Sequence, residues 1–158
     1  MDKKTHIRFF LIFALASLFG LSSCNKNTGD NLDPIPNTPV SLTINLDLPA
    51  YFDLTLNGNF MYFSDGYKGV IVYHGFDDQY YAFDRACSYK PTDACSQLWM
   101  DSTTRMNMFC GSYTNGIYEK CCDSRFELPS GFPAQGPATF SMKQYYVSRS
   151  GNTLFVNN

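Results

Sequence analysis

The stretch Ser41-Leu42-Thr43-Ile44-Asn45-Leu46-Asp47-Leu48 decides the fold, because polar and apolar side chains alternate along it without a break. A period of two residues places the apolar side chains on one face of a strand and the polar ones on the other. The stretch therefore predicts a half-buried β-strand directly after residue 40.

Short aromatic and β-branched runs continue this pattern along the chain, at residues 60–63, 69–74, 79–83, 144–148 and 153–156. Turn-forming residues separate the first three runs, and Arg149-Ser150-Gly151-Asn152 joins the last two as a terminal hairpin. No window of helical length carries an apolar stripe with a 3.6-residue period. We therefore expect an all-β domain, either an antiparallel sandwich or a small barrel.

The composition is that of one folded domain. The 158 residues include 44% apolar and 16% aromatic side chains, which is enough to bury a core. The 12 basic and 14 acidic residues give a net charge of −2, with no block of Lys or Arg. A nucleic-acid partner is therefore not expected, because the phosphate backbone is bound through clustered positive charge.

The N-terminus has the pattern of an export signal. Lys3, Lys4 and Arg8 precede an apolar run over residues 9–21, which ends in Leu21-Ser22-Ser23-Cys24. The run is too short for a membrane helix, which needs about 20 residues to cross the bilayer core. Residues 1–23 are therefore predicted to be a signal peptide.

The ending Leu-Ser-Ser-Cys resembles the bacterial lipobox, the signature in which the cysteine is diacylated and becomes the new N-terminus. This resemblance implies lipidation of Cys24, attachment to a membrane through the lipid, and a place in the cell envelope, with the outer membrane expected. Residues 24–39 are polar with three prolines, and are either an extended tether or a plain disordered tail. The domain itself is expected over residues 40–158.

Five further cysteines fall within one 36-residue stretch: Cys87, Cys95, Cys110, Cys121 and Cys122. In an exported protein such a cluster usually forms disulfides. The alternative is a four-thiolate set for zinc or an iron-sulfur cluster, made by the first three and one of the last two. The stretch has no Cys-x2-Cys pair, so no metal site is expected.

Two segments in this region, Ala82-Phe83-Asp84-Arg85-Ala86-Cys87-Ser88-Tyr89 and Glu119-Lys120-Cys121-Cys122-Asp123-Ser124-Arg125-Phe126, are followed by Gly136-Pro137-Ala138 and Leu154-Phe155-Val156. They resemble the two loops of the Rieske domain, Cys-x-His and Cys-Pro-x-His-Gly-Ser-x-Phe, which hold a [2Fe-2S] cluster. The resemblance covers about residues 40–158, and this part of the chain is similar to Rieske-like lipoproteins of Bacteroidota. It implies a Rieske-like all-β fold with a Cys-rich loop subdomain at about residues 85–130.

On this resemblance, the four cluster-ligand positions carry Cys87, Tyr89, Glu119 and Cys122. A Rieske centre needs two cysteines and two histidines. The chain has two histidines, of which His6 lies in the signal peptide and His74 on a predicted strand before the first loop. The usual Rieske centre is therefore excluded within a monomer, and no cofactor is expected. A [2Fe-2S] or other thiolate-ligated cluster is the alternative.

The same resemblance implies where disulfides form. In many Rieske proteins of cytochrome bc complexes a disulfide ties the two loops, and Cys95 and Cys121 lie near the positions of its cysteines. We therefore expect the pairs Cys95–Cys121 and Cys87–Cys122, each stabilising the fold by about 2 to 4 kcal/mol. Cys110 is then left over, either buried or free to react.

No catalytic site is expected, because His74 is the only imidazole that remains after the signal is removed, and it borders a polar turn. The leading hypothesis is a non-catalytic, lipid-anchored scaffold or interaction module with an unidentified protein partner. The first alternative is electron transfer, by a thiolate-ligated cluster or by a dithiol at Cys121 and Cys122. The second is ligand binding by exposed tyrosines of the pairs Tyr80-Tyr81 and Tyr145-Tyr146.

Overall fold

The computed structural model describes residues 33–158, so the predicted signal peptide, Cys24 and the first part of the predicted tether lie outside it. The described elements are β1 (Ser41–Asn45), a 3-10 helix η2 (Pro49–Thr55), β2 (Phe60–Phe63), β3 (Val70–His74), β4 (Tyr80–Asp84), β5 (Gln97–Met100), β6 (Asn107–Thr114), β7 (Ile117–Glu127), β8 (Pro133–Gln135), β9 (Gln144–Ser150) and β10 (Thr153–Asn157). Apart from η2, every regular element in residues 33–158 is a strand.

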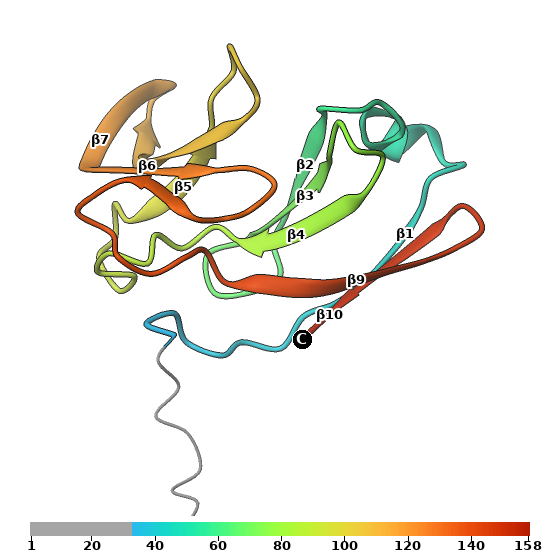
Figure 1. Cartoon of the computed structure of the whole chain (residues 1–158), viewed down its shortest axis with the longest axis horizontal. Coiled ribbons are helices and arrows are strands. Elements are labelled where there is room, and N and C mark those ends of the chain that lie inside the picture. The colour runs from blue at the N-terminus through green and yellow to red at the C-terminus, as the bar shows by residue number, and fades with distance from the viewer. Residues whose placement is uncertain (1–32) are drawn as a thin grey trace, which may run out of the picture. The chain divides into compact units, whose positions relative to one another are not determined.

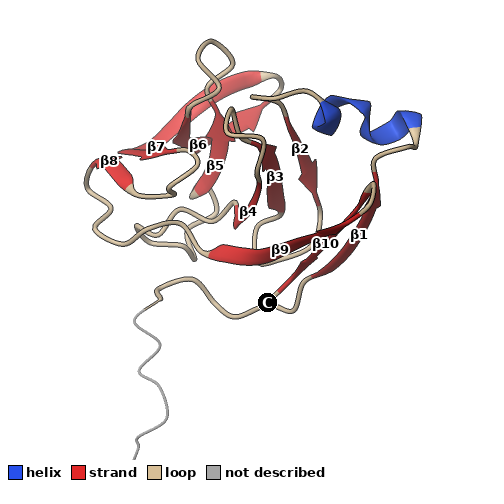
Figure 2. Ribbon diagram, turned by 45° about the vertical axis from the view of Figure 1, so that its right-hand side comes forward, coloured by secondary structure: helices blue, strands red, loops and turns tan. Residues whose placement is uncertain are grey.

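The strands form two antiparallel sheets (Figures 1 and 2). The larger sheet has six strands in the order β1-β10-β9-β4-β3-β2, and the smaller has four in the order β5-β6-β7-β8. The smaller sheet contains Cys110, Cys121 and Cys122. The expected all-β, antiparallel architecture with a separate Cys-rich part is therefore confirmed.

The larger sheet is made of the hairpins that the sequence predicts. The runs at 60–63, 69–74 and 79–83 form β2, β3 and β4, which pair in sequence order. The terminal hairpin is also confirmed, with a turn tighter than expected, because Ser150 pairs directly with Thr153. Gly151, which has a φ of +57°, supplies the left-handed conformation that a two-residue turn requires.

The predicted strand at 41–48 is correct in its first half and wrong in its second. β1 ends at Asn45, whose side-chain oxygen accepts a hydrogen bond from the backbone N–H of Asp47 at 3.0 Å and turns the chain. The alternation nevertheless keeps Ile44 and Leu46 buried, whereas Leu48 is 49% exposed. The side-chain hydrogen bond therefore overrides a strand pattern that continues in the sequence.

Two apolar cores lie on opposite faces of the larger sheet, and β3 contributes to both. Ile71 and Tyr73 point into the core between the two sheets, where they meet side chains of β5, β6 and β7. Val70 and Val72 point into the second core, which β1, β9, β10 and η2 enclose. Since β3 is buried on both faces, it reads as a continuous apolar run rather than an alternating one.

The second predicted loop, residues 119–126, is a strand in the structure. It lies within β7, which pairs with β6 on one side and β8 on the other. Exposed Glu119, Lys120 and Asp123 break the apolar alternation, which is why the sequence pattern did not indicate a strand there. The Cys-rich region is therefore a sheet as well as a set of loops.

The last part of the predicted tether, residues 33–39, packs against the domain. Ile35 is only 2% exposed, and the Lys143 ammonium donates hydrogen bonds to the Pro36 carbonyl and the Asn37 side chain. Across residues 33–158, no helix has the length and apolar character needed to cross a membrane.

Candidate functional site

Three cysteine sulfurs meet where the smaller sheet joins the larger one. Cys87 follows β4, and its backbone N–H donates to the Ser96 carbonyl at 3.2 Å, just before β5. A neighbouring bridge pairs Ala86 with Gln97. These contacts fix the backbone on which the Cys87 sulfur points into the core between the sheets, where it is fully buried.

Cys110 and Cys122 are brought together by an irregular pairing of β6 with β7. Phe109 pairs with Arg125 and Gly111 with Lys120, so residues 121–124 of β7 lie opposite Cys110 alone. Such bulges redirect side chains and are common next to functional sites. Here the bulge allows Cys121 and Cys122 to point to different partners.

The sulfurs of Cys87, Cys110 and Cys122 lie within 4.8 Å of one another. The Sγ atoms of Cys87 and Cys122 are 3.9 Å apart. Cys87 and Cys110 are fully buried, whereas Cys122 is half-buried and gives the group its contact with the surface. We call these three residues the thiol cluster.

The cluster is electrostatically asymmetric. Hydrogen bonding from Cys110 is the largest influence on Cys87, and with the backbone N–H of Tyr89 it lowers the pKa of the Cys87 thiol to about 6. The same contact, together with burial, raises the pKa of Cys110. Of these two thiols, Cys87 is therefore the one favoured as a thiolate, with Cys110 as its neutral S–H donor.

The disulfide between Cys95 and Cys121 is confirmed, with their Cα atoms 5.5 Å apart. The second expected pair is wrong: Cys87 and Cys122 are both free thiols in the structure, at van der Waals separation. Cys110 is buried, one of its two expected states, but it is not isolated. Its sulfur belongs to the same cluster because the β6–β7 bulge turns Cys122 toward it.

Two of the expected ligand positions do not join the cluster. Glu119 is exposed near the β6–β7 turn, where its carboxylate accepts a hydrogen bond from the Thr114 hydroxyl at 3.4 Å. Tyr89 packs its ring against the core, and its carbonyl accepts a hydrogen bond from the Ser96 hydroxyl at 3.1 Å. Of the four expected ligand positions, the structure thus brings only Cys87 and Cys122 together. Cys110 joins them, whereas Tyr89 and Glu119 do not.

His74 lies on β3, away from the thiol cluster. Its Nε2 atom is 3.1 Å from an Asp78 carboxylate oxygen, and its ring stacks on Tyr80 with centroids 4.2 Å apart. No other histidine is present in residues 33–158. The residues at the cluster therefore do not fit a Rieske centre, which needs two imidazoles, and three free thiols do not complete a four-cysteine iron-sulfur set.

Asp84, at the end of β4, is a structural residue that the sequence analysis missed. It is fully buried, and its carboxylate accepts four hydrogen bonds of 2.6 to 3.2 Å, from the backbone N–H groups of Tyr67, Lys68 and Ala86 and from the Tyr145 hydroxyl. Burial is the largest cause that raises the pKa of Tyr145, and the hydrogen bond from its hydroxyl to Asp84 is the second. Asp84 therefore ties the segment that leads to Cys87 to the larger sheet.

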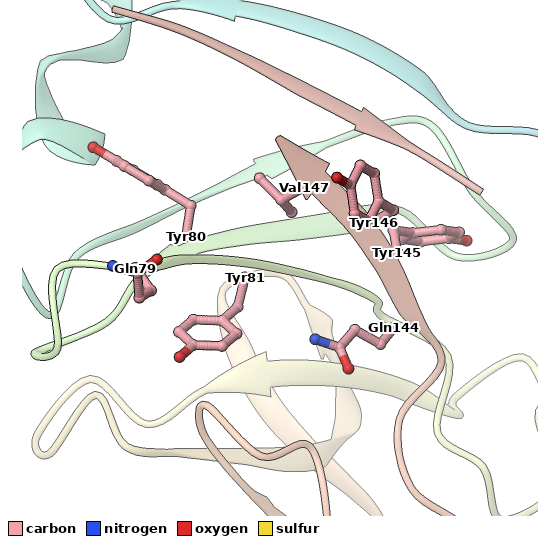
Figure 3. A pocket seen from close by; sticks show the side chains of 7 residues that line it. All are labelled: Gln79, Tyr80, Tyr81, Gln144, Tyr145, Tyr146 and Val147. Carbon is pink, nitrogen blue, oxygen red and sulfur yellow. The ribbon is translucent and has the colours of Figure 1, made fainter. Parts of the chain in front are cut away.

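The expected tyrosine pairs line an open pocket of about 500 Å³ between β4 and β9 (Figure 3). It forms because these strands pair at only two positions, Ala82 with Tyr145 and Phe83 with Gln144, and then separate. Tyr80 donates its hydroxyl to the Leu54 carbonyl, and Tyr145 is buried. Tyr146 is the one largely exposed tyrosine of this pocket, so the pocket offers no continuous aromatic platform.

No protein-family model matches the chain. No curated protein matches it either. Among solved structures, the chain is similar to the ferredoxin of carbazole 1,9a-dioxygenase from Nocardioides aromaticivorans IC177, with 18% identity and a TM-score of 0.44. The match covers 76% of this chain and 97% of that one. A likeness of this strength does not indicate a shared cofactor or activity.

Proposed function

We propose that this protein is a lipid-anchored member of the cell envelope whose Rieske-like β domain serves as a non-catalytic interaction module. The observation that carries the proposal is the Cys95–Cys121 disulfide, which ties the chain shortly after the first segment that resembles a Rieske cluster loop to the second such segment. The loop framework is thus held by a covalent link that needs no iron. Disulfides of this kind persist in exported proteins, in agreement with the signal and lipobox pattern that ends at Cys24.

The position of His74 supports the same proposal. The His74 ring, at the end of β3, contacts Asp78 and stacks on Tyr80, so no imidazole of residues 33–158 is left at the cluster to hold the second iron of a Rieske centre. Within residues 33–158, no imidazole lies beside any of the three free thiols, where a nucleophilic site would use one as a base. A module that binds a partner, rather than an enzyme, accounts for these features.

The proposal is tested on the full-length chain purified in detergent. We expect no visible iron-sulfur absorbance, no stoichiometric iron, and a Cys95–Cys121 link in the non-reduced protein. A coloured protein with two irons per chain would contradict the proposal, whatever the ligands.

The anchor is tested separately by cell fractionation. Cys24→Ser is expected to release the protein from the membrane fraction, because the acyl chains can no longer be attached. Cys110→Ser is the matched control, since it replaces another cysteine and leaves the lipobox intact. Retention of Cys24→Ser in the membrane would contradict lipid anchoring.

Electron transfer through a thiolate-ligated group is the second candidate function. The close approach of the Cys87 and Cys122 sulfurs favours it, since both also occupy expected ligand positions. This alternative predicts that Cys122→Ala abolishes a redox-active colour or titration. The interaction module predicts only a loss of stability from the same substitution.

A further inference from the structure

We propose that Cys87, Cys110 and Cys122 bind a single thiophilic metal ion with a filled d shell, Zn²⁺ or Cu⁺, through their three sulfurs. This site goes beyond the proposed function, because an interaction module does not require a metal. It also differs from the ligand set that the Rieske resemblance implies, since Cys110 comes from a strand that lies between the two cluster-loop segments.

The spacing of the sulfurs is that of ligands to one ion. With metal–sulfur bonds of about 2.3 Å, two thiolates on the same ion lie about 3.8 to 4.0 Å apart, whereas the atoms of a disulfide lie about 2.0 Å apart. Cys87 and Cys122 are separated by 3.9 Å, and no pair in the cluster exceeds 4.8 Å. A point equidistant from all three sulfurs therefore lies about 2.6 Å or less from each, within a small adjustment of bonding distance.

The presence of a third thiol distinguishes a metal site from two reduced cysteines that could oxidise to a disulfide. Oxidation of Cys87 and Cys122 would leave Cys110 as an unpaired buried thiol beside them. One ion uses all three. The three residues come from separate parts of the chain, and the β6–β7 bulge turns Cys122 toward Cys110.

Soft thiolate ligands select Cu⁺ and Zn²⁺ over hard cations. Charge also favours an ion. Three thiols this close together, two of them buried, can all be deprotonated only when a cation neutralises their negative charge.

A second layer of polar contacts supports the ligand from β7. The Ser124 hydroxyl lies 3.3 Å from the Cys122 sulfur and accepts a hydrogen bond from the Ala138 N–H at 2.9 Å. Ser124 is only 1% exposed, so its orientation is fixed. Once Cys122 is deprotonated, this hydroxyl can donate to the thiolate in return, as groups behind metal ligands commonly do.

An open pocket of about 380 Å³ provides an entry path to the cluster. Cys122 and Ser124 line it, together with neighbouring side chains of the four-stranded sheet such as Tyr118 and Lys120. An ion can therefore reach Cys122 from solvent and pass inward to the two buried sulfurs. The same opening leaves room for a water or a partner's side chain as a fourth ligand, which Zn²⁺ requires and three-coordinate Cu⁺ does not.

The experiment titrates the full-length chain, purified in detergent without added metal, with Zn²⁺ in competition with a chromogenic chelator. We expect one Zn²⁺ per chain. The Kd should rise by about 100-fold or more in Cys110→Ser, and by about 10-fold in Ser124→Ala. Cys95→Ala/Cys121→Ala, which removes two sulfurs outside the cluster, is the matched control and should keep one ion per chain.

The Cu⁺ arm repeats the titration under anaerobic conditions with a Cu⁺-specific chelator. Tighter binding of Cu⁺ without a fourth ligand would assign a three-coordinate site, and stoichiometric Zn²⁺ at neutral pH would assign the four-coordinate one. Binding of either ion supports the proposal. Failure of both, or retention of either by Cys110→Ser at unchanged affinity, would overturn it.

A second measurement does not depend on whether the variants fold. In the unsubstituted chain, bound metal should slow alkylation of Cys87, Cys110 and Cys122 together, as followed residue by residue by mass spectrometry. Alkylation rates that do not change with metal would overturn the site and leave the interaction module intact. Two irons per chain would instead remove both.

Discussion

The two sheets of this domain are built in different ways. The six-stranded sheet contains the consecutive strands β2, β3 and β4 and the β9–β10 hairpin, and its strand β3 is buried on both faces. The four-stranded sheet carries an exposed β6–β7 hairpin and a bulge opposite Cys110, and together with the segment between β4 and β5 it holds one disulfide and three free thiols. Local pattern and burial define the first sheet, whereas sulfur chemistry and irregular pairing define the second.

The largest expected effect comes from breaking the connection between the two regions. Asp84→Ala leaves three backbone N–H groups and the buried Tyr145 hydroxyl without their acceptor, and we expect it to lower the free energy of unfolding by about 4 kcal/mol. Urea denaturation measures this loss.

The control for Asp84 is Asp123→Ala on β7, an exposed carboxylate whose ion pair with Lys120 should contribute less than about 0.5 kcal/mol. A loss of less than about 1 kcal/mol for Asp84→Ala would mean that the carboxylate is not the connection described here.

The next effect is confined to the Cys-rich region. Cys95→Ala/Cys121→Ala opens a link between residues 26 apart in sequence, and the loop-entropy relation predicts a loss of about 3.5 kcal/mol. Denaturation with and without a reductant measures it. The unsubstituted chain should lose this stability on reduction, whereas the double variant should be insensitive to the reductant. An unsubstituted chain that is equally stable in both conditions would contradict the prediction.

A smaller effect tests the tight pairing of β6 with β7. A Cβ atom at Gly111 would lie 2.5 Å from both the Glu119 carbonyl oxygen and the Tyr118 ring, so Gly111→Ala is expected to cost about 2 kcal/mol. Ser112→Ala, the next residue on the strand, should change stability by less than about 0.5 kcal/mol. Equal stability of the two variants in a thermal melt would show that the strands are not packed this closely.

The smallest effect is a difference in how tyrosines titrate. Burial raises the pKa of Tyr118 to about 12, from the ordinary value of 10.0. Since the folded-state pKa is higher, the stabilisation is complete below pH 10 and is lost as the pH rises through about 12. Spectrophotometric titration should show a late transition that Tyr118→Phe removes, and the variant's stability should fall less steeply above pH 10. A late transition that persists unchanged in Tyr118→Phe would contradict this assignment.

The sequence analysis succeeded where local pattern determines structure. The runs at 60–63, 69–74, 79–83, 144–148 and 153–156 each carry β-forming residues between turn signals, and each is a strand. The one local error in this sheet was the end of the first strand, where the Asn45 side chain turns the chain before its apolar alternation stops.

The second sheet could be predicted only in part. Its β7 strand is largely exposed, so no apolar alternation indicated it, and residues 119–126 were expected to form a loop. The Rieske resemblance led to the Cys95–Cys121 pair, because that pair depends only on which segments come together. The place of Cys110 depends on the β6–β7 register shift, a non-local feature that no short stretch of sequence encodes.

The central claim is that the Cys-rich region holds one disulfide and three clustered free thiols. Mass-spectrometric mapping of the non-reduced, alkylated protein tests it most directly. The account predicts a single link, Cys95–Cys121, with Cys87, Cys110 and Cys122 all recovered as alkylated thiols after unfolding. Recovery of a Cys87–Cys122 link, or of Cys110 in any disulfide, would contradict it.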